Sequence, residues 1–464
     1  MNTNTKAKAK PKPTAKPAKP DEKQNDAPPS PELEFSSLIA ANPNFVSDGS
    51  IIYAWDGDIW SPIEPGEMEK KAFNWLSSHE RHKSRATPRL ATSCAAAALL
   101  KARPLPKIEI KNRIILPLQN GYLHVDFEKG QLELKKPEKG IGLAYKIKCD
   151  FLPEAQAPLF HKFLAEILPD AETRDYVQEY AGYTLMPDTR YQSGMWWLGS
   201  GANGKSTLVE IIAALHAKIS SIGLANLDGF ALVSLVGASL VWVDETPRRI
   251  DEQRLKTLIS GGVVQIDRKF RDPINLKPFA KWIICGNELP AISDQTHGFW
   301  RRFAVVDFKR QFADHEKDPL LARKIIENEL SGVLNWAIAG LLRLVQRGRF
   351  PVISAQMRDI LETGQRETNN VLAWWQDERG VLSDADFTSR TDVYSDYRFH
   401  AQMHGTMPVS AERFWARVKQ ILGDKLKTQD KKIKGQKVRM VNIQLTQSPD
   451  DGGPSHYNAY QARK

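Results

Sequence analysis

The sequence predicts an α/β protein, and the alternation of its apolar runs is the main observation behind this class. Strand-like runs at residues 194–198, 239–243, 281–285 and 303–308 are separated by segments with helical spacing. Such an alternation is typical of a sheet covered by helices. The second observation is length, because 464 residues with 41% hydrophobic composition suffice for roughly three domains of about 150 residues each.

Residues 1–36 are expected to be a disordered basic tail. The first twenty residues contain six lysines and no acidic residue, and they carry too few large apolar side chains to form a core. The tail could contact nucleic acid or act only as a solubilising arm. No apolar segment follows the charges, which excludes a signal peptide.

Residues 37–190 are expected to form a mixed α+β domain that ends on helices. Helical spacing begins near Pro158, and Asp170 is predicted to cap a helix that ends near Gly182. Two dipeptides lie between apolar runs and are typical of hairpin turns. They are Asp56-Gly57 and Asn120-Gly121.

Charge and cysteine usage limit the class of protein. The net charge of +10 indicates a polyanionic partner only where the charge is clustered. Cys94, Cys149 and Cys285 are too far apart for a paired-cysteine motif, and their odd number fits a reducing cytosol. No apolar run reaches the length of a membrane span, so we expect no membrane partner and a cytoplasmic location.

A glycine-rich loop is the strongest functional signal. Gly199, Gly204, Lys205 and Ser206 satisfy the pattern G-x-x-x-x-G-K-[ST], in which backbone N–H groups surround phosphate oxygens. The pattern predicts that Lys205 reaches the β- and γ-phosphates of ATP and that the Ser206 hydroxyl binds Mg²⁺. The neighbouring residues expected to bind nucleotide are Gly201, Asn203 and Thr207.

An acidic pair follows the next apolar strand. Asp244 is the candidate for the Mg²⁺ shell, and Glu245 is the candidate base that orients the attacking water. An exposed acidic pair at a strand end is the simpler alternative, and the preceding loop motif argues against it. No guanine-recognition motif follows, which disfavours a GTPase.

Polar residues also flank the last two strands. Asn287 follows the strand at 281–285 and is expected to polarise the water or sense the γ-phosphate, although alone it would suit a turn. Arg301 and Arg302 precede the strand at 303–308. They form either a solvated edge or an arginine finger that reaches the ATP of a neighbouring subunit, which requires an oligomer.

The order of these motifs resembles that of the superfamily 3 helicases. The segments that carry the resemblance are GSGANGKST, VWVDE, SGGVVQIDRKFRDPINLKP, IICGNELP and GFWRRFAVVDF. They are most similar to the helicase part of the phage and plasmid primase-helicase family, and the similarity covers about residues 150–345. It implies an AAA+ P-loop ATPase domain at 191–345, a homo-hexameric ring, and a location in a bacterial or phage-infected host cell.

The resemblance also implies residues that contact single-stranded DNA in the ring pore. Lys269 occupies the position of the lysine on the family's pore hairpin, and Arg271 would share its face. A solvated hairpin lysine is the alternative. Phe270 departs from the polar residue that is usual there and suggests a stacking contact. The family's arginine finger corresponds to Arg302, with Arg301 as the fallback.

The chain departs from primase-linked family members upstream of the loop. It has neither a clear polymerase-type domain nor a zinc module there. Asp56 and Asp58 imitate a metal-binding acidic pair, but a hairpin turn is the favoured interpretation. A primase or initiator would therefore be a separate partner.

After a long helix at 320–347 and a linker helix at 346–370, residues 371–464 are expected to form a C-terminal domain. Ser410 is predicted to cap a helix that carries Arg413 and Arg417, and residues 425–439 hold seven Lys or Arg, Lys432 among them, against one Asp. The arrangement resembles the family's winged-helix domain, which implies binding to duplex or origin DNA. A ring-stabilising or docking domain is the alternative.

These observations predict an ATP-dependent DNA helicase that acts in replication of a phage, plasmid or other mobile element. One alternative is a replication initiator in which ATP acts only as an assembly switch. Another is a P-loop motor or kinase for a substrate other than nucleic acid.

Overall fold

The computed structural model describes residues 28–108, 113–247, 249–268, 271–290, 292 and 297–446. The chain divides into two units. Unit 1 comprises the described residues up to Pro43 together with Glu64–Ala102, and unit 2 comprises Asn44–Ile63 and the described residues from Arg103 onward.

Unit 1 is helical. Its helices are α1 (Pro31–Ala41), α2 (Pro65–Ser78), η1 (Lys83–Arg85) and α3 (Pro88–Lys101). Helix α1 begins within the segment expected to be a disordered tail, because the Ser30 hydroxyl caps it and Phe35 and Ile39 are buried. The core of the unit is small, and half of its members are alanine or cysteine. Its buried hydrophobic residues are Phe35, Ile39, Met68, Ala72, Leu76, Ala91, Cys94 and Ala98.

The hairpins predicted from the two turn dipeptides are confirmed, and both belong to unit 2. Strands β2 (Ile52–Trp55) and β3 (Trp60–Pro62) pair antiparallel in a small sheet with β1 (Phe45–Ser47) and β4 (Arg103–Pro104). Strands β5 (Arg113–Leu118) and β6 (Gly121–Asp126) form the second hairpin, and β7 (Gln131–Lys135) extends it. The Asp56 carboxylate accepts hydrogen bonds from the backbone N–H groups of Asp58 and Ile59, which is how an aspartate builds a turn.

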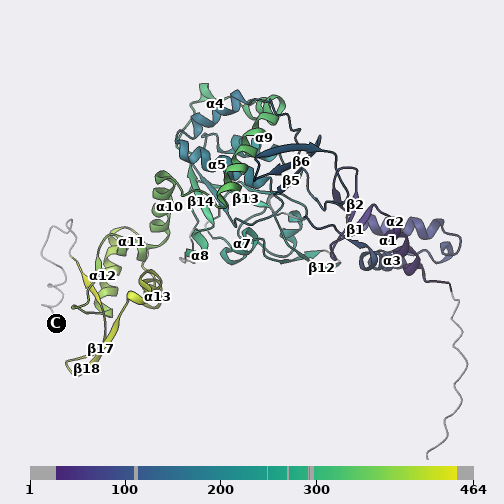
Figure 1. Ribbon diagram of the computed structural model, residues 1–464. Coiled ribbons are helices and arrows are strands. Elements are labelled where there is room, and N and C mark those ends of the chain that lie inside the picture. The colour runs from purple at the N-terminus through teal and green to yellow at the C-terminus, as the bar shows by residue number, and fades with distance from the viewer. Residues whose placement is uncertain are drawn as a thin grey trace, which may run out of the picture. The chain divides into compact units, whose positions relative to one another are not determined.

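The centre of unit 2 is a parallel sheet with strand order β14-β8-β13-β10-β9. Strands β13 and β14 of this sheet are labelled in Figure 1. The predicted strands are confirmed within one residue at each end. They are β8 (Gly194–Leu198), β10 (Leu240–Val243), β13 (Lys281–Gly286) and β14 (Phe303–Asp307), and β9 (Ile219–Ser220) completes the sheet. Every neighbouring pair in this order is parallel, so the carboxyl ends of the strands lie at one edge.

Alternate residues of these strands face two different apolar layers. Met195 and Trp197 of β8 pack into one core with helices α4 (Pro158–Ile167), α5 (Ala171–Thr184), α6 (Lys205–Ala214) and α9 (Leu321–Arg347). Trp196 and Leu198 pack into the other core with residues of η2 (Gly229–Leu235), α7 (Glu252–Ile259) and α8 (His297–Trp300). This two-sided burial explains why the strands are apolar runs and not alternating patterns.

The structure groups the residues of the expected domain at 37–190 differently. Residues 64–102 form unit 1 with the described residues before residue 44. Helices α4 and α5 share one core with the central sheet, because the apolar face that predicts each helix packs on the sheet. The predicted cap at Asp170 is confirmed, since its carboxylate accepts from the N–H of Thr173 at 2.9 Å. The predicted long helix corresponds to α9.

A hairpin lies between β10, which precedes the acidic pair Asp244 and Glu245, and β13, which precedes Asn287. Its strands are β11 (Val264–Arg268) and β12 (Arg271–Leu276), which pair antiparallel. Ile266 and Ile274 are paired in register and buried, whereas Gln265 is exposed. The hairpin is thus anchored by one apolar face.

The C-terminal part of unit 2 has a core of its own, built around Trp374, Tyr397, Phe414 and Val418. Helix α10 (Ala355–Thr368), within the expected linker, precedes it. The predicted cap is confirmed, because Ser410 accepts from the N–H of Arg413. The elements after α10 are α11 (Asn370–Gln376), β15 (Gly380–Leu382), β16 (Thr388–Ser389), α12 (Arg390–Met403), α13 (Ala411–Leu422), η4 (Gly423–Lys425), β17 (Thr428–Ile433), β18 (Gln436–Val441) and β19 (Ile443–Leu445). A remaining short element, η3 (Asp314–Glu316), precedes α9.

Candidate functional site

The candidate site lies at the carboxyl edge of the central sheet. The register pairs Leu198 of β8 with Gly286 of β13, and Val243 of β10 with Ile284 of β13. The segments that follow these three strands therefore start side by side. This edge is where open α/β sheets bind ligands, because loops and helix N-termini converge there.

The glycine-rich loop, residues 199–206, connects β8 to α6 as the motif predicts. The N–H of Gly199 donates to the carbonyl of Gly286 at 3.1 Å, which ties the start of the loop to β13. The buried Asn203 amide donates to the carbonyl of Phe308 at 3.3 Å, and its oxygen accepts from the N–H of Lys205 at 3.4 Å. The loop is thus braced from both neighbouring strands.

Lys205 points across the loop rather than into solvent. Its ammonium donates to the carbonyls of Gly199 at 2.9 Å and Gly286 at 3.3 Å, and the residue is only 8% exposed. Ser206 is exposed and Thr207 is half-buried in the first turn of α6. The N-terminus of this helix carries a partial positive charge, so the loop, the ammonium and the helix all favour an anion.

The acidic pair follows β10 at the same edge, and Asp244 and Glu245 are both exposed. Asp244 and Lys205 both interact electrostatically with the buried thiol of Cys285, and they change its pKa in opposite directions. Burial raises the pKa of this thiol to about 12, while Lys205 lowers it and Asp244 raises it. The carboxylate and the ammonium therefore both lie close enough to the end of β13 to act on Cys285, and their effects are opposite because their charges are opposite.

Thr246 fixes the segment that carries the acidic pair, and the sequence did not reveal this role. Its hydroxyl donates to the carbonyl of Cys285 at 2.8 Å and accepts from the indole N–H of Trp196 at 3.0 Å. The segment after β10 is thereby attached to both β13 and β8. Asn287 is exposed directly after β13, so the structure brings it to the same edge as the loop and the acidic pair.

A second segment that the sequence did not single out follows β14. The Gln311 amide donates to the Ser200 hydroxyl at 2.9 Å, and the N–H of Phe312 donates to the carbonyl of Ala202 at 2.8 Å. These bonds hold the outer side of the glycine-rich loop. The only sequence signal is the position of the segment after an apolar strand.

Arg301 and Arg302 lie at the opposite end of the sheet from the loop, because they precede β14 and β14 is parallel to β8. The Arg302 guanidinium donates to the Ser260 hydroxyl at 3.0 Å and to the carbonyl of Gly298. Arg301 is exposed. Neither arginine can therefore serve the loop of its own chain.

The predicted DNA-binding residues of the hairpin are only partly described. Lys269 lies outside the described residues. Arg271 begins β12, and its side chain also lies outside them. What the structure provides is the hairpin itself, which begins after α7 and continues into β13.

The basic residues of the C-terminal part differ in their surroundings. Arg413 on α13 is exposed, and so is Lys432 on β17 opposite Lys437 of β18. Arg417 is half-buried and donates to the amide oxygen of Asn369 at 3.3 Å. Burial lowers the pKa of this guanidinium. Arg417 is thus a structural contact to the start of α11 as well as a basic residue.

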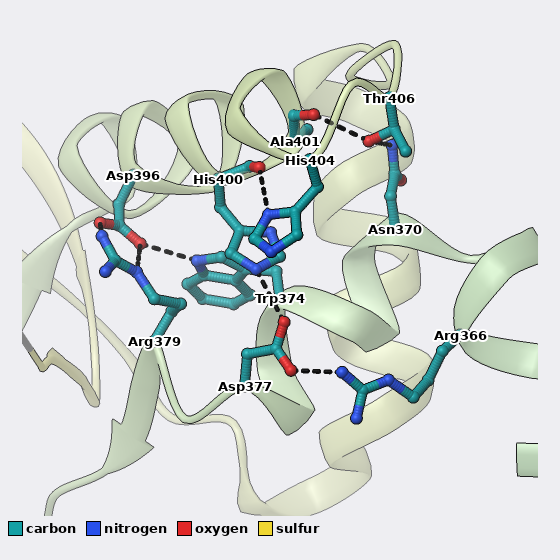
Figure 2. A network of polar contacts seen from close by, with 10 residues as sticks. All are labelled: Arg366, Asn370, Trp374, Asp377, Arg379, Asp396, His400, Ala401, His404 and Thr406. Atoms are coloured by element: carbon teal, nitrogen blue, oxygen red, sulfur yellow. Dashed lines mark hydrogen bonds and ion pairs between the residues drawn. The ribbon is translucent and has the colours of Figure 1, made fainter. Parts of the chain in front are cut away.

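Polar contacts hold α11 and α12 together, as Figure 2 shows. The indole N–H of Trp374 donates to Asp396 at 2.7 Å, and Arg379 pairs with the same carboxylate at 2.8 Å. On the other side, Asp377 lies between Arg366 and His400. These contacts fix the helices on which α13 packs.

Two further findings concern the part of the chain that the structure describes. Among the described residues, no helix is long and apolar enough to cross a membrane. Cys94, Cys149 and Cys285 are buried and unbridged.

Comparison with known proteins gives one family and several viral relatives. Residues 197–302 match DUF5906, a family of unknown function. A putative helicase of Acanthamoeba polyphaga mimivirus is 29% identical over 225 residues, which cover 43% of this chain and 23% of that protein. A putative helicase of Invertebrate iridescent virus 3 is 24% identical over 240 residues, which cover 47% of this chain and 25% of that protein. A putative primase of African swine fever virus is 24% identical over 169 residues, which cover 34% and 18%.

The chain thus matches a quarter or less of the length of these relatives. Among solved structures, the apo C-terminal region of NrS-1 has a TM-score of 0.51 at 14% identity, with 90% of this chain and 100% of that chain covered. A second structure of that region, residues 305–718, has a TM-score of 0.50 at 15% identity, with the same coverage. These structures share the mixed α/β fold.

Proposed function

We propose that the protein is an ATP-dependent DNA helicase of the superfamily 3 type. The observation that carries the proposal is the convergence of Lys205, Asp244 and Asn287 at one edge of the parallel sheet. The similarity to viral proteins named as helicases and primases supports DNA as the substrate. In this proposal the sheet and its helices are an AAA+ P-loop core, and the C-terminal part is a winged-helix domain.

The residues of the loop fit MgATP as their ligand. The Lys205 ammonium is held by two backbone carbonyls and has no acidic partner among the described residues, so it can reach the β- and γ-phosphates. Ser206 would supply a hydroxyl to Mg²⁺ from the first turn of α6, and Asp244 would hold the water shell of the ion. Bound MgATP supplies the phosphoryl group that is transferred to water.

Two further residues would act on the attacking water. Glu245 is exposed beside Asp244 and is the candidate to orient the water and accept its proton. Asn287, at the end of the neighbouring strand, is the candidate to polarise the water or sense the γ-phosphate. Thr246 acts as a positioning residue, because it fixes the segment of the acidic pair to β13.

The position of the two arginines supports an assembly of several copies. Because they lie at the amino end of β14, they could complete only the loop of another copy. Arg302 is bonded to Ser260 and Gly298 of its own chain, which favours the exposed Arg301 as the finger. A homo-hexameric ring is the assembly we propose, with a separate primase or initiator as its partner.

DNA would contact the protein at two places. Lys269 and Arg271 on the hairpin are proposed to hold single-stranded DNA in the ring pore, where a lysine can grip phosphates without selecting bases. Arg413 and Lys432 are exposed on α13 and β17, and we propose that they contact duplex or origin DNA with Arg417 in support. The lysines between residues 425 and 437, together with Arg439, lie around Lys432 in the sequence and would provide the cationic surface.

The test compares the parent protein with Lys205→Ala and Glu245→Gln in three assays: ATP binding, ATP hydrolysis with and without single-stranded DNA, and displacement of a strand from a forked duplex. We expect Lys205→Ala to weaken binding and Glu245→Gln to bind ATP without turnover. Glu172→Gln on the exposed face of α5 is the matched control.

Each alternative function predicts a different result. Hydrolysis and DNA binding without strand displacement would indicate an initiator switched by ATP. Hydrolysis that ignores DNA would indicate a motor for another substrate. Parental turnover in Glu245→Gln would reject the assignment of the base.

A further inference from the structure

Unit 1 contains a cluster of metal-ligating side chains that is separate from the candidate ATP site. Glu34 lies on α1, and His79 and His82 lie in the turn between α2 and η1. The Glu34 carboxylate oxygen Oε2 is 2.9 Å from Nε2 of His82 and 3.9 Å from Nε2 of His79. One ligand atom from each of the three residues lies within 4.8 Å of the other two.

The spacing of these atoms fits a small cation. Zn²⁺ binds imidazole nitrogen and carboxylate oxygen at about 2.0–2.2 Å, so two ligand atoms of a tetrahedral site are about 3.4 Å apart. The Glu34 oxygen is hydrogen-bonded to Nε2 of His82 at 2.9 Å and lies 3.9 Å from Nε2 of His79, so each distance is within about 0.5 Å of that value. Two nitrogens and one oxygen form a ligand set that suits zinc, with water as the fourth ligand.

The hydrogen bonds of the cluster are incomplete. Nδ1 of His79 is buried and has no hydrogen-bond partner among the described residues, and Nε2 is too far from the Glu34 carboxylate for a hydrogen bond. Neither ring nitrogen of His79 therefore has a hydrogen-bond partner among the residues that the structure describes. A cation between the three side chains would give Nε2 the partner it lacks.

Neighbouring side chains hold the cluster in shape. Arg81 pairs with the other Glu34 oxygen, Oε1, at 3.0 Å, which leaves Oε2 directed at the histidines. The Trp75 ring lies 5.2 Å from the His79 ring and 5.3 Å from the His82 ring, and the two imidazoles stack at 4.6 Å. Metal sites use such outer contacts to orient their ligands.

We propose that Glu34, His79 and His82 bind a Zn²⁺ ion that stabilises unit 1. The ion would connect α1 to the end of α2, two helices that are far apart in the sequence. The core of the unit is small, with three alanines and one cysteine among its buried hydrophobic residues. Such a link would therefore add stability that the core alone does not provide. Small domains often require a metal or a disulfide because their cores bury too little apolar surface.

A second cluster in the C-terminal part offers a matched control. Asp377, His400 and His404 also place ligand atoms within 4.8 Å of one another. However, the two Asp377 oxygens are already engaged by Arg366 and His400, as Figure 2 shows. Nδ1 of His404 is 2.9 Å from the carbonyl of His400. Nδ1 of His400 has no hydrogen-bond partner among the described residues, but one ring nitrogen of each histidine is already engaged. In this respect both differ from His79, so His400→Ala should leave zinc binding unchanged.

The experiment uses the full chain, stripped of metal with a chelator and titrated with Zn²⁺ or with Co²⁺ as a spectroscopic probe. We expect one equivalent of Zn²⁺ per chain, the visible absorption of tetrahedral Co²⁺, and a higher unfolding temperature for the loaded protein. His79→Gln and His82→Ala should each weaken binding by more than about tenfold, since even outer-shell partners of a metal contribute about 10- to 100-fold. His79→Gln changes a partly exposed side chain, so this variant should fold.

Three results would overturn the proposal. The first is the absence of a bound equivalent at micromolar Zn²⁺. The second is equal affinity in the parent, His79→Gln and His82→Ala. The third is loss of binding in His400→Ala but not in the unit 1 variants. Circular dichroism of each metal-free variant distinguishes a lost ligand from a lost fold.

Discussion

The close contact between Gly204 and α4 leads to a prediction that can be worked out quantitatively. Gly204 has a φ of +79°, and an added Cβ would lie 2.6 Å from Cγ2 of Ile167 and 3.0 Å from the Phe163 ring. Both neighbours are buried. Ile167 is β-branched and cannot easily turn its methyl group away. Gly201 in the same loop has a φ of +102° but open space around its added Cβ.

The two substitutions to alanine should therefore differ in cost. Gly201→Ala introduces only backbone strain, roughly 1–2 kcal/mol for an L-residue in a left-handed conformation. Gly204→Ala adds overpacking against α4, which costs roughly 1–3 kcal/mol more. We expect Gly204→Ala to lower the free energy of unfolding by roughly 2–5 kcal/mol, or to displace the loop and weaken nucleotide binding by a corresponding factor.

The assay is a pair of measurements on both variants. Denaturant unfolding gives the loss of stability, and titration with a fluorescent ATP analogue gives the loss of binding. The sum of the two losses should be larger for Gly204→Ala by roughly 1–3 kcal/mol. Equal sums for Gly201→Ala and Gly204→Ala would show that α4 does not support the loop, and the reasoning from the contact would be wrong.

Three further predictions concern other parts of unit 2. Burial lowers the pKa of His216 to about 3, while the ring hydrogen-bonds to Ser239 and Thr184. The unfolded chain protonates this histidine near pH 6.5, whereas the folded chain does so only near pH 3. The contribution of neutral His216 to the free energy of unfolding is therefore complete above about pH 6.5 and is lost as the pH falls towards 3. In denaturant unfolding between pH 7 and 5, the free energy of unfolding should fall by about 2 kcal/mol less in His216→Gln than in the parent. Mixing an Arg301→Ala chain with a Lys205→Ala chain should restore part of the ATPase activity if the arginine acts between copies, and no recovery in confirmed mixed assemblies would count against it. Replacing Arg413 and Lys432 with alanine should weaken duplex binding and reduce its salt slope by about 0.9 per lost phosphate contact, and an unchanged slope would favour a docking role for α13.

Local sequence patterns predicted much of the candidate site. The strands β8, β10, β13 and β14 end within one residue of the apolar runs, because a buried strand must be apolar on both faces. Helix caps were equally predictable, since Asp170 and Ser410 act on N–H groups three residues away. The placement of Asp244 and Asn287 at one edge with the loop follows from the parallel order of the strands.

Long-range hydrogen bonds were not predictable from the same patterns. Thr246 connects to Cys285 and Trp196, which are 39 and 50 residues away in the chain, and no local spacing indicates either partner. The proposed zinc ligands were not predictable for the same reason, because they come from segments that are far apart in the chain. His79 and His82 form a recognisable His-x-x-His pair, but Glu34 approaches them from a helix 45 residues earlier.

The basic residues show why charge alone does not predict a contact. Arg302 and Arg417 appear in the sequence as free cations, yet each donates hydrogen bonds to its own chain. A guanidinium has five N–H donors and satisfies them wherever packing brings an acceptor close. Whether an arginine binds a phosphate or braces the fold is therefore decided by its neighbours in space. That distinction selects Arg301 over Arg302 as the finger, and Arg413 over Arg417 as the direct DNA contact, in the proposals above.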